Sequence, residues 1–316
     1  MAALTRPFLE DDAPAVADLM RRTVPGYLVT AERLLHWRRS APQGAEFHDW
    51  VAEDDRQIVA YANAFFQWWL EPGIAEPWVL VAPESRRRGI GAHLYEQAEH
   101  DLVERGAWKL KTNAFDDDGR RFASRRGYAE TRRERLSELD VRAADVSELD
   151  QLEAVKAAEG YAIAPLRQLR ERETELHALY LEAAKDMPGD DPHREVELEQ
   201  WRRDTLEDPL LDLDGSMNVV EGGRPVAFAW IVSDREGRRA EHELTGTLRA
   251  DRGRGLARLA KLAVVRWCRE NGIDTLLTGN DSANAHMLAI NDRLGYVPSV
   301  VHTEVAKVLR AQPATR

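Results

Sequence analysis

Cysteine is nearly absent from this sequence. Its 316 residues include one cysteine, Cys268, which excludes an intrachain disulfide framework and cysteine-rich metal sites. The nine histidines show no His-x-x-x-His or other spacing typical of a metal site. We therefore expect no bound metal, and we interpret Cys268 as a small core residue near the apolar face of a helix.

Long apolar runs are also missing. The longest of them, such as residues 62–70, are interrupted or too short to cross a membrane. Residues 1–7 lack the charged start and the long apolar region of a signal peptide. The sequence therefore predicts a cytoplasmic protein that has no membrane partner.

Positive charge is in deficit. The chain carries 44 Lys and Arg against 55 Asp and Glu, a formal net charge of −11. This balance argues against general nucleic-acid binding. The hydrophobic fraction of 43% is sufficient for buried cores, and the length allows one or two domains.

What the sequence does contain is a distinctive glycine-rich turn, Arg252-Gly253-Arg254-Gly255-Leu256-Ala257. A possible strand, residues 243–248, precedes it, and apolar residues at helical spacing follow from Leu256 to Trp267. The first N–H groups of a helix have no internal partner, and the helix dipole favours negative charge. Glycines let the backbone approach a phosphate closely. This stretch therefore predicts an anion site.

The same arrangement occurs earlier in the chain, at Arg86-Arg87-Arg88-Gly89-Ile90-Gly91. The two turns are separated by 166 residues, and the Gly-Tyr pairs that follow them are separated by 168. Strand, turn, helix, strand, helix and Gly-Tyr thus occur twice in the same order. Two long copies indicate two similar domains and not a solenoid. We place these domains at residues 1–142 and 143–316.

Hydrophobic periodicity predicts the elements around both turns. In the first half we expect strands over residues 4–8, 48–52, 57–66, 77–81, 108–112 and 136–141, and helices over residues 11–22, 30–39, 89–104 and 120–125. In the second half we expect strands over residues 217–221, 225–232, 243–248 and 274–278, and helices over residues 152–156, 165–185, 195–206, 256–267 and 282–294. Composition predicts a loop over residues 187–192.

Neither turn belongs to the common nucleotide-binding motifs. No Gly-Lys-Ser or Gly-Lys-Thr follows, as a Walker loop requires, and the third glycine of the Rossmann pattern is missing. Both turns instead resemble the acyl-CoA signature of the GNAT N-acetyltransferase superfamily, (Gln/Arg)-x-x-Gly-x-(Gly/Ala). The matching residues are Arg86-x-x-Gly89-x-Gly91 and Arg252-x-x-Gly255-x-Ala257.

The second half also resembles the later motif of this superfamily. Asn284-x-x-Met287-x-x-x-Asn291-x-x-Leu294-Gly295-Tyr296 is similar to Asn-x-x-Ala-x-x-x-Tyr-x-x-Leu-Gly-Phe. The resemblance covers most of the chain as two successive domains, a layout similar to that of mycothiol synthase and other tandem members. It implies an α/β fold in which each domain is a mixed, mostly antiparallel sheet flanked by helices.

The resemblance implies acetyl-CoA as the acyl donor. Backbone N–H groups of each turn would hold the pyrophosphate, with charge-assisted contacts from the arginines. The strand that enters each turn would pair with the pantetheine arm, and the amide of Asn284 would bond that arm. The residues implied in the second domain are Thr247, Leu248, Arg252, Gly253, Arg254, Gly255, Leu256, Ala257, Arg258 and Asn284. Those implied in the first domain are Val81, Arg86, Arg87, Arg88, Gly89, Ile90, Gly91, Ala92 and His93.

Acetyl transfer needs a neutral amine and a polarised thioester. A carboxylate can remove the amine proton, often through water, and a strand N–H can stabilise the oxyanion. Glu241 and Glu243 precede Thr247 on the strand that enters the second turn. With a period of two, both share the face of Thr247 unless a bulge intervenes. Both are candidates for the base, although each could equally be a solvated strand charge.

Two departures from the family pattern concern the proton donor. Asn291 and Ala123 stand where the family often has a tyrosine that reprotonates the CoA thiolate. Asn291 can hydrogen-bond the sulfur but is not an acid of matched pKa, so water would supply the proton. The first copy also has Asp116 in place of the asparagine of the later motif. We therefore expect both domains to bind acyl-CoA and the second to carry the chemistry.

The sequence thus predicts direct transfer of an acetyl group from acetyl-CoA to a primary amine of a small molecule or peptide. The competing hypothesis is a non-catalytic acyl-CoA-binding or regulatory protein with degenerate domains. A third hypothesis is a nucleotide-binding protein that prefers ATP or NAD to CoA. The sequence leaves the acceptor and the oligomeric state open.

Overall fold

The computed structural model describes residues 3–24, 26–185, 191 and 193–311. It divides into two compact units. Unit 1 comprises Met1–Arg133, Asp190–Arg194 and Val301–Arg316, and unit 2 comprises Glu134–Gly189 and Glu195–Val300. The predicted domain boundary after residue 142 remains a prediction.

Unit 1 contains a mixed sheet in the order β1-β2-β3-β4-β5-β12. Its strands are β1 (Leu4–Pro7), β2 (His48–Asp54), β3 (Gln57–Phe66), β4 (Ile74–Val81), β5 (Lys109–Ala114), the first residues of β6 (Ala129–Asp140) and residues 301–308 of β12 (Val297–Val308). Its helices are α1 (Ala13–Thr23), α2 (Ala31–Ser40), α3 (Ile90–Glu104) and α4 (Asp117–Ser124), with 3₁₀ turns η1 (Glu10–Asp12) and η2 (Pro83–Ser85). Neighbouring strands are antiparallel except β4 and β5, which are parallel.

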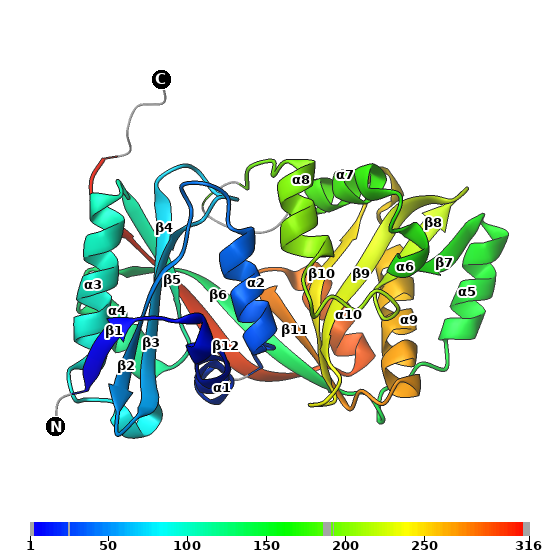
Figure 1. The fold of residues 1–316 in the computed structure, drawn as a ribbon. Coiled ribbons are helices and arrows are strands. Elements are labelled where there is room, and N and C mark those ends of the chain that lie inside the picture. The colour runs from blue at the N-terminus through cyan, green and yellow to red at the C-terminus, as the bar shows by residue number, and fades with distance from the viewer. Residues whose placement is uncertain (1–2, 25, 186–190, 192, 312–316) are drawn as a thin grey trace. The chain divides into compact units, whose positions relative to one another are not determined.

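Helices cover both faces of the unit 1 sheet (Figure 1). Because side chains alternate along a strand, successive residues of β4 face opposite helices. Trp78 and Leu80 pack in one core with α1 and α2, whereas Ala75 packs in another with α3. We call these the α1–α2 face and the α3 face.

Unit 2 has the same plan. Its strand order is β6-β11-β10-β9-β8-β7, and β10 and β11 form its parallel pair. Its further strands are β7 (Tyr161–Pro165), β8 (Met217–Glu221), β9 (Arg224–Asp234), β10 (Arg239–Thr247) and β11 (Thr275–Asp281). Its helices are α5 (Leu149–Ala158), α6 (Leu166–Leu169), α7 (Glu173–Ala184), α8 (Leu198–Trp201), α9 (Leu256–Glu270) and α10 (Ala285–Leu294), with a π-helical turn η3 (Arg202–Leu206) and a 3₁₀ turn η4 (Arg249–Asp251). The apolar stripe of α9 packs on one sheet face, and α7 and α8 cover the other.

Most predicted elements around the two turns are present, within a few residues at their ends. The fold class is confirmed: both units are mixed, mostly antiparallel sheets flanked by helices. Three predictions were wrong. The helix predicted over residues 165–185 begins with Pro165 at the end of strand β7 and is interrupted between α6 and α7. The helix predicted over residues 195–206 starts at Leu198 and becomes π-helical after Trp201.

The third error was an omission, because no strand was predicted over β7 or β12. The loop predicted over residues 187–192 lies outside the described residues except for Asp191.

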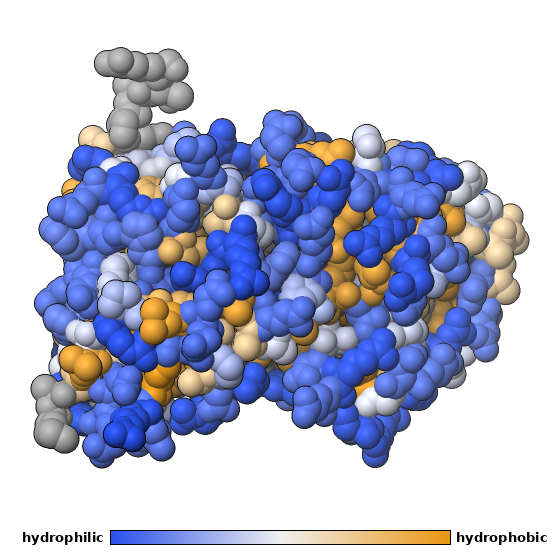
Figure 2. Space-filling model, in the orientation of Figure 1, coloured by the Kyte–Doolittle hydropathy of each residue, from blue (hydrophilic) through white to orange (hydrophobic). Residues whose placement is uncertain are grey.

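Hydrophilic residues cover most of the face drawn in Figure 2, with hydrophobic residues in separate patches between them. Among the described residues, no helix is long and apolar enough to cross a membrane.

Candidate active site

The first arginine-glycine turn has a backbone that suits an anion. Gly89 caps α3 with a φ of 85°, and Arg87 has a φ of 64°. A Cβ atom placed on Gly89 would have no neighbour within 4 Å, so the space above the helix N-terminus is open. Successive residues of opposite backbone hand turn their N–H groups toward one side, and α3 adds its dipole.

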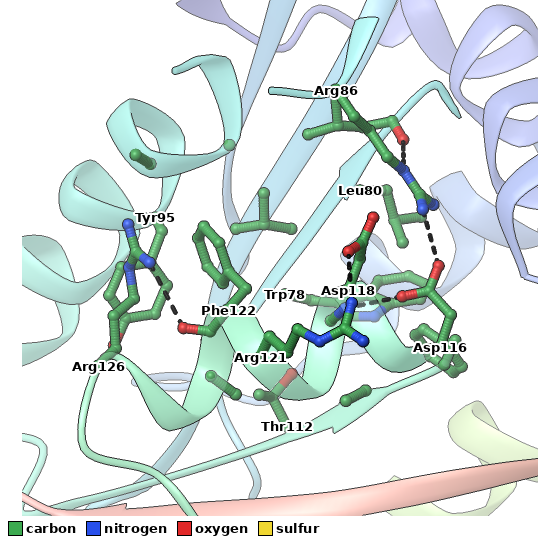
Figure 3. Close-up of a pocket in the computed structure, with 18 of the residues that line it drawn as sticks. Trp78, Leu80, Arg86, Tyr95, Thr112, Asp116, Asp118, Arg121, Phe122 and Arg126 are labelled. Carbon is green, nitrogen blue, oxygen red and sulfur yellow. Dashed lines mark hydrogen bonds and ion pairs between the residues drawn. The ribbon is translucent and has the colours of Figure 1, made fainter. Parts of the chain in front are cut away.

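A cavity of about 550 Å³ lies beside this turn, in unit 1 (Figure 3). The predicted residues that line it are Val81, Arg86, Arg87, Gly89, Ile90, Gly91 and Ala92. Arg88 and His93 are directed elsewhere: Arg88 pairs with Asp54 at 2.7 Å, and the His93 ring lies 3.2 Å from the Thr5 hydroxyl. The rest of the cavity lining comes mainly from β4, β5 and α4, including Trp78, Thr112, Asp116 and Phe122.

Carboxylates already engage the arginines of the first turn. Arg86 donates from Nε to the Val81 carbonyl at 3.2 Å and from Nη1 to Asp116 at 2.7 Å (Figure 3). Arg87 lies 3.3 Å from Asp118. Arg86 and Asp116 are both partly exposed to solvent, so a bound anion can compete for the guanidinium group.

The parallel strands β4 and β5 pair only at Ile74 with Lys109 and at Ala75 with Leu110. Beyond this point the described residues show no further pairing between them, so the strands diverge at Glu76. Pro77, which has no N–H to give to a ladder, lies at this divergence. The cavity is lined by β4 from Pro77 to Val81 and by β5 from Thr112 to Ala114, so it occupies the space that the divergence opens.

Glu76 is a partly buried carboxylate on the α1–α2 face at this divergence. It accepts a hydrogen bond from Gln67 Nε2 at 2.7 Å. Burial raises its pKa to about 7, and nearby Glu304 acts in the same direction, whereas hydrogen bonds from Gln67 and Thr112 oppose the shift. A carboxylate with this pKa can accept a proton near neutral pH.

Glu76 does not stand out in the sequence, for an identifiable reason. The strand expected from the sequence begins at Pro77, so Glu76 falls outside the element that enters the first turn, whereas the observed strand begins at Ile74. The repeat offers the signal that could have found it, since Glu76 precedes the first turn by as many residues as His242 precedes the second.

The second turn has the same backbone. Gly255 caps α9 with a φ of 77°, and Gly253 has a φ of 76°. Arg252 donates from Nε to the Thr247 carbonyl at 3.2 Å, which reproduces the contact of Arg86 with Val81. Arg254 contacts Asp251 and the Tyr161 hydroxyl. The predicted residues of this turn are therefore brought together at one helix N-terminus.

The strand that enters the second turn differs at the point of divergence. The parallel pairing of β10 with β11 ends at Glu241, so His242 takes the place of Glu76. His242 is buried with Nε2 3.1 Å from the Tyr296 hydroxyl, and burial holds its pKa well below the usual range. The register between β10 and β9 shifts between His242 and Leu244. A bulge therefore interrupts the strand at this point. It breaks the alternation that would place Glu241 and Glu243 both on the face of Thr247.

The two predicted asparagines of unit 2 have internal partners. Asn284 caps α10, where its Oδ1 accepts from the Met287 N–H at 3.1 Å. Asn291 is fully buried, and its Nδ2 donates to Asn280 Oδ1. Asp116 caps α4 in unit 1 in the same way, accepting from the Gly119 N–H at 2.7 Å. In each unit, the first residue of the later motif thus caps the helix that follows it with its side chain.

Comparison with known proteins identifies the family. The model of the acetyltransferase (GNAT) family matches residues 14–128 and again residues 174–296. The chain belongs to the GNAT acetyltransferase family. Acetyltransferases of this family use acetyl-CoA as the acyl donor, so the recognition from the two signatures is confirmed.

Relatives match this GNAT chain over most of its length. It is 26% identical over 305 residues to a mycothiol acetyltransferase of Propionibacterium freudenreichii, covering 93% of this chain and 88% of the relative. A tandem GNAT protein from the clavulanic acid biosynthesis pathway has a TM-score of 0.75 at 20% identity, with 98% of this chain and 100% of that chain covered. A GCN5-related N-acetyltransferase of Sphaerobacter thermophilus has a TM-score of 0.70 at 19% identity, with 98% and 96% covered.

Proposed function

We propose that this GNAT protein acetylates a primary amine in unit 1, with Glu76 as the general base. The observation that carries the proposal is the position of Glu76. It lies where β4 and β5 part, next to a cavity that begins at the acyl-CoA signature turn. The turn would hold the pyrophosphate through its backbone N–H groups, and the cavity would take the pantetheine arm.

The chemistry follows from this placement. The Glu76 carboxylate removes a proton from the ammonium or from the attacking amine, and the nitrogen adds to the thioester carbonyl carbon. Backbone groups of β4 beyond Ala75 have no β5 partner in the described ladder, so they can pair with the pantetheine arm and donate to the oxyanion. The carbon–sulfur bond then breaks and the thiolate leaves.

Among the residues that the structure describes, the two tyrosines that line the cavity do not replace the missing tyrosine at Ala123 as an acid. Tyr95 and Tyr128 line the cavity, and their hydroxyls lie 3.2 Å apart. Burial raises the pKa of both phenols above its ordinary value, which makes each a weaker acid. We infer that the thiolate leaves as an anion and takes its proton from water.

The sequence predicts the chemistry in unit 2, and that prediction remains open. Unit 1 is the better supported location because His242, at the place of Glu76, is buried against Tyr296 and burial disfavours its protonation. We therefore propose that the second turn binds acyl-CoA without catalysing transfer. A role for Glu241 or Glu243 as base, and for Asn291 at the sulfur, is the alternative that the following experiment tests.

Equivalent substitutions by a bulky residue at the two turns distinguish these possibilities. Gly91 lines the unit 1 cavity, and a Cβ there would lie 3.1 Å from Val81 Cγ2. Ala257 holds the equivalent place in the second signature. We expect Gly91→Leu to reduce acetylation of an amine panel by about a hundredfold or more, because the pantetheine path is blocked. Ala257→Leu should leave turnover nearly unchanged, with thermal melting as the folding control for both. The reverse pattern would place the chemistry in unit 2.

A further inference from the structure

Four aromatic side chains gather at one edge of the α1–α2 face of unit 1. Phe47 stacks on Phe65 with ring centroids 4.4 Å apart. Trp68 and Trp69 lie 6.2 and 6.1 Å from Phe65, and 4.8 Å from each other. Phe65 is buried, whereas the other three rings keep part of their surface in solvent. We call this group the aromatic wall.

The aromatic wall adjoins the proposed base. Phe65 is the direct cross-strand partner of Glu76 in the antiparallel pair β3–β4. Direct partners project from the same face with Cβ atoms about 5 Å apart. Gln67, which donates to Glu76, immediately precedes the two tryptophans in the chain. The wall and the carboxylate therefore share one face and one end of β4.

On its other side, Glu76 lies near charged side chains that form ion pairs with one another. Lys111 on β5 pairs with Asp191 at 3.0 Å and with Glu304 at 3.2 Å. Lys109 also pairs with Asp191, at 2.7 Å. Because each of these ions has a partner of opposite charge, this side offers little net attraction to a second charge on an acceptor. An acceptor at Glu76 gains most from apolar contact on the side of the wall.

We propose that the acceptor is an arylalkyl amine, a primary amine joined to an aromatic ring by a short aliphatic chain. Its ring packs against the exposed parts of Trp68, Trp69 and Phe47, and its nitrogen reaches Glu76. Aromatic pairs prefer offset or edge-to-face contact and contribute about 0.5–1.5 kcal/mol beyond the buried area. This inference rests on the proposed acetyltransferase function of unit 1 and names its substrate class.

The transfer on this substrate is balanced without any further reactant. A bond forms between the amine nitrogen and the acetyl carbonyl carbon, and the carbon–sulfur bond of acetyl-CoA breaks. The electron pair stays on the CoA sulfur, and the amine proton passes to the Glu76 carboxylate. The products are the N-acetylated arylalkyl amine and the CoA thiolate, and Glu76 then releases its proton to water, from which the thiolate is protonated.

Three amines of similar length test the inference with the full-length protein and acetyl-CoA. 2-Phenylethylamine carries a ring, n-hexylamine is apolar without one, and 1,4-diaminobutane has a second charge. We expect kcat/KM for 2-phenylethylamine to exceed both others by about tenfold or more. Equal or better use of either aliphatic amine would overturn the inference while leaving the acetyltransferase function standing. Turnover of none of the three, with acetyl-CoA still bound, would overturn both.

Substitutions in the wall provide the second arm. Trp68→Leu should raise KM for 2-phenylethylamine by about fivefold with little change in kcat, and leave the n-hexylamine parameters unchanged. Trp68→Phe should restore KM, because it keeps a ring. Trp267→Leu, in unit 2, is the matched control and should have no effect on KM. If Trp68→Leu unfolds the protein by thermal melting, Phe47→Leu makes the same test. A change in kcat alone, or an equal change for both amines, would contradict the inference.

Discussion

Glu76 and His242 hold matching places, each directly after the parallel pairing of its unit ends. Their surroundings give them opposite chemistry. Burial favours the uncharged form of both, which for Glu76 raises the pKa to about 7 and for His242 lowers the pKa well below its usual range. Glu76 can therefore take up a proton near neutral pH, while His242 stays a neutral, hydrogen-bonded core residue.

A second residue contrast concerns the anion that each turn can hold. Asp116 binds Arg86 in unit 1, whereas the corresponding residue of unit 2 is the neutral Asn284. In the proposed binding mode, pyrophosphate therefore competes with Asp116 for the Arg86 guanidinium group. Both side chains are partly exposed, so the competition is weakened by solvent.

We predict that Asp116→Asn tightens acetyl-CoA binding to unit 1 by about threefold, because it frees Arg86 and removes a negative charge. Asparagine caps helices as well as aspartate does, so α4 keeps its N-terminus. Isothermal titration against acetyl-CoA measures the change. Asp117→Asn, which alters a carboxylate outside the cavity lining, is the control and should leave the affinity unchanged. Weaker binding in Asp116→Asn would show that the Arg86–Asp116 pair is needed for the site.

The two helices that follow the turns, α3 and α9, bury different side chains. Lys261 lies on the buried face of α9 with 1% of its surface exposed. Its Nζ lies 5.3 Å from the centroid of the Tyr296 ring, and His242 contacts the hydroxyl of the same tyrosine. Burial lowers the pKa of Lys261 from its ordinary 10.5 to about 7. The helix thus buries an amine that is largely uncharged above neutral pH.

This burial predicts a pH-dependent stability for unit 2. Between pH 7 and 10.5 the unfolded chain binds a proton at Lys261 that the folded chain does not, so stability rises with pH across this window. The destabilisation of the folded state by the buried Lys261 amine is fully present below about pH 7 and disappears toward pH 10.5.

Lys261→Met should remove this slope and stabilise unit 2 by about 2 kcal/mol or more at neutral pH. Thermal unfolding of wild type and variant across this range measures both effects, and Lys185→Met, at an exposed lysine, should change neither. A variant that keeps the slope would assign it to other groups.

Sequence patterns predicted the two turns and their helices well for a physical reason. A glycine at positive φ before an amphipathic helix is a local requirement, and Gly89 and Gly255 both meet it. Strands β7 and β12 were missed because strand formation depends on distant partners. The first part of β12 is largely exposed, so its alternation is weak there. The helix expected over residues 165–185 begins with Pro165, which in the structure ends strand β7.

The candidate site was predicted unevenly. The acyl-CoA signatures could be recognised in the sequence because their residues are contiguous. Seven of the nine residues implied at the first turn line the cavity. Glu76 could not be recognised from the sequence, since its proposed role depends on where β4 and β5 part. The bulge after His242 was allowed for but could not be placed, because register is set by pairing with β9.

At the scale of the whole molecule, unit 1 depends on the end of the chain. Residues 303–308 of β12 pair with β5, Val305 lies in the unit 1 core, and Glu304 contacts Lys111. Unit 1 is therefore built from segments far apart in the sequence. A fragment of the first domain alone lacks the strand beside β5.

We predict that a chain ending at Val300 loses acetyl-CoA binding at the first turn, because exposing the edge of β5 and removing Val305 destabilises the unit 1 core by about 3 kcal/mol or more. Hydrogen exchange of β5 amides and titration with acetyl-CoA follow the two effects. The control is a chain ending at Arg310, which keeps all of β12. A fragment of residues 1–142 that folds and binds acetyl-CoA by itself would contradict this dependence.

The most direct test of the proposed active site is the rate of acetyl transfer in Glu76→Gln across pH. In wild type kcat should rise as pH increases through about 7, because only the ionised carboxylate of Glu76 accepts the amine proton. In Glu76→Gln we expect kcat to fall by about 10²- to 10⁴-fold and to lose that pH dependence, with acetyl-CoA affinity unchanged. A variant that keeps the wild-type rate and pH profile would show that Glu76 is not the base.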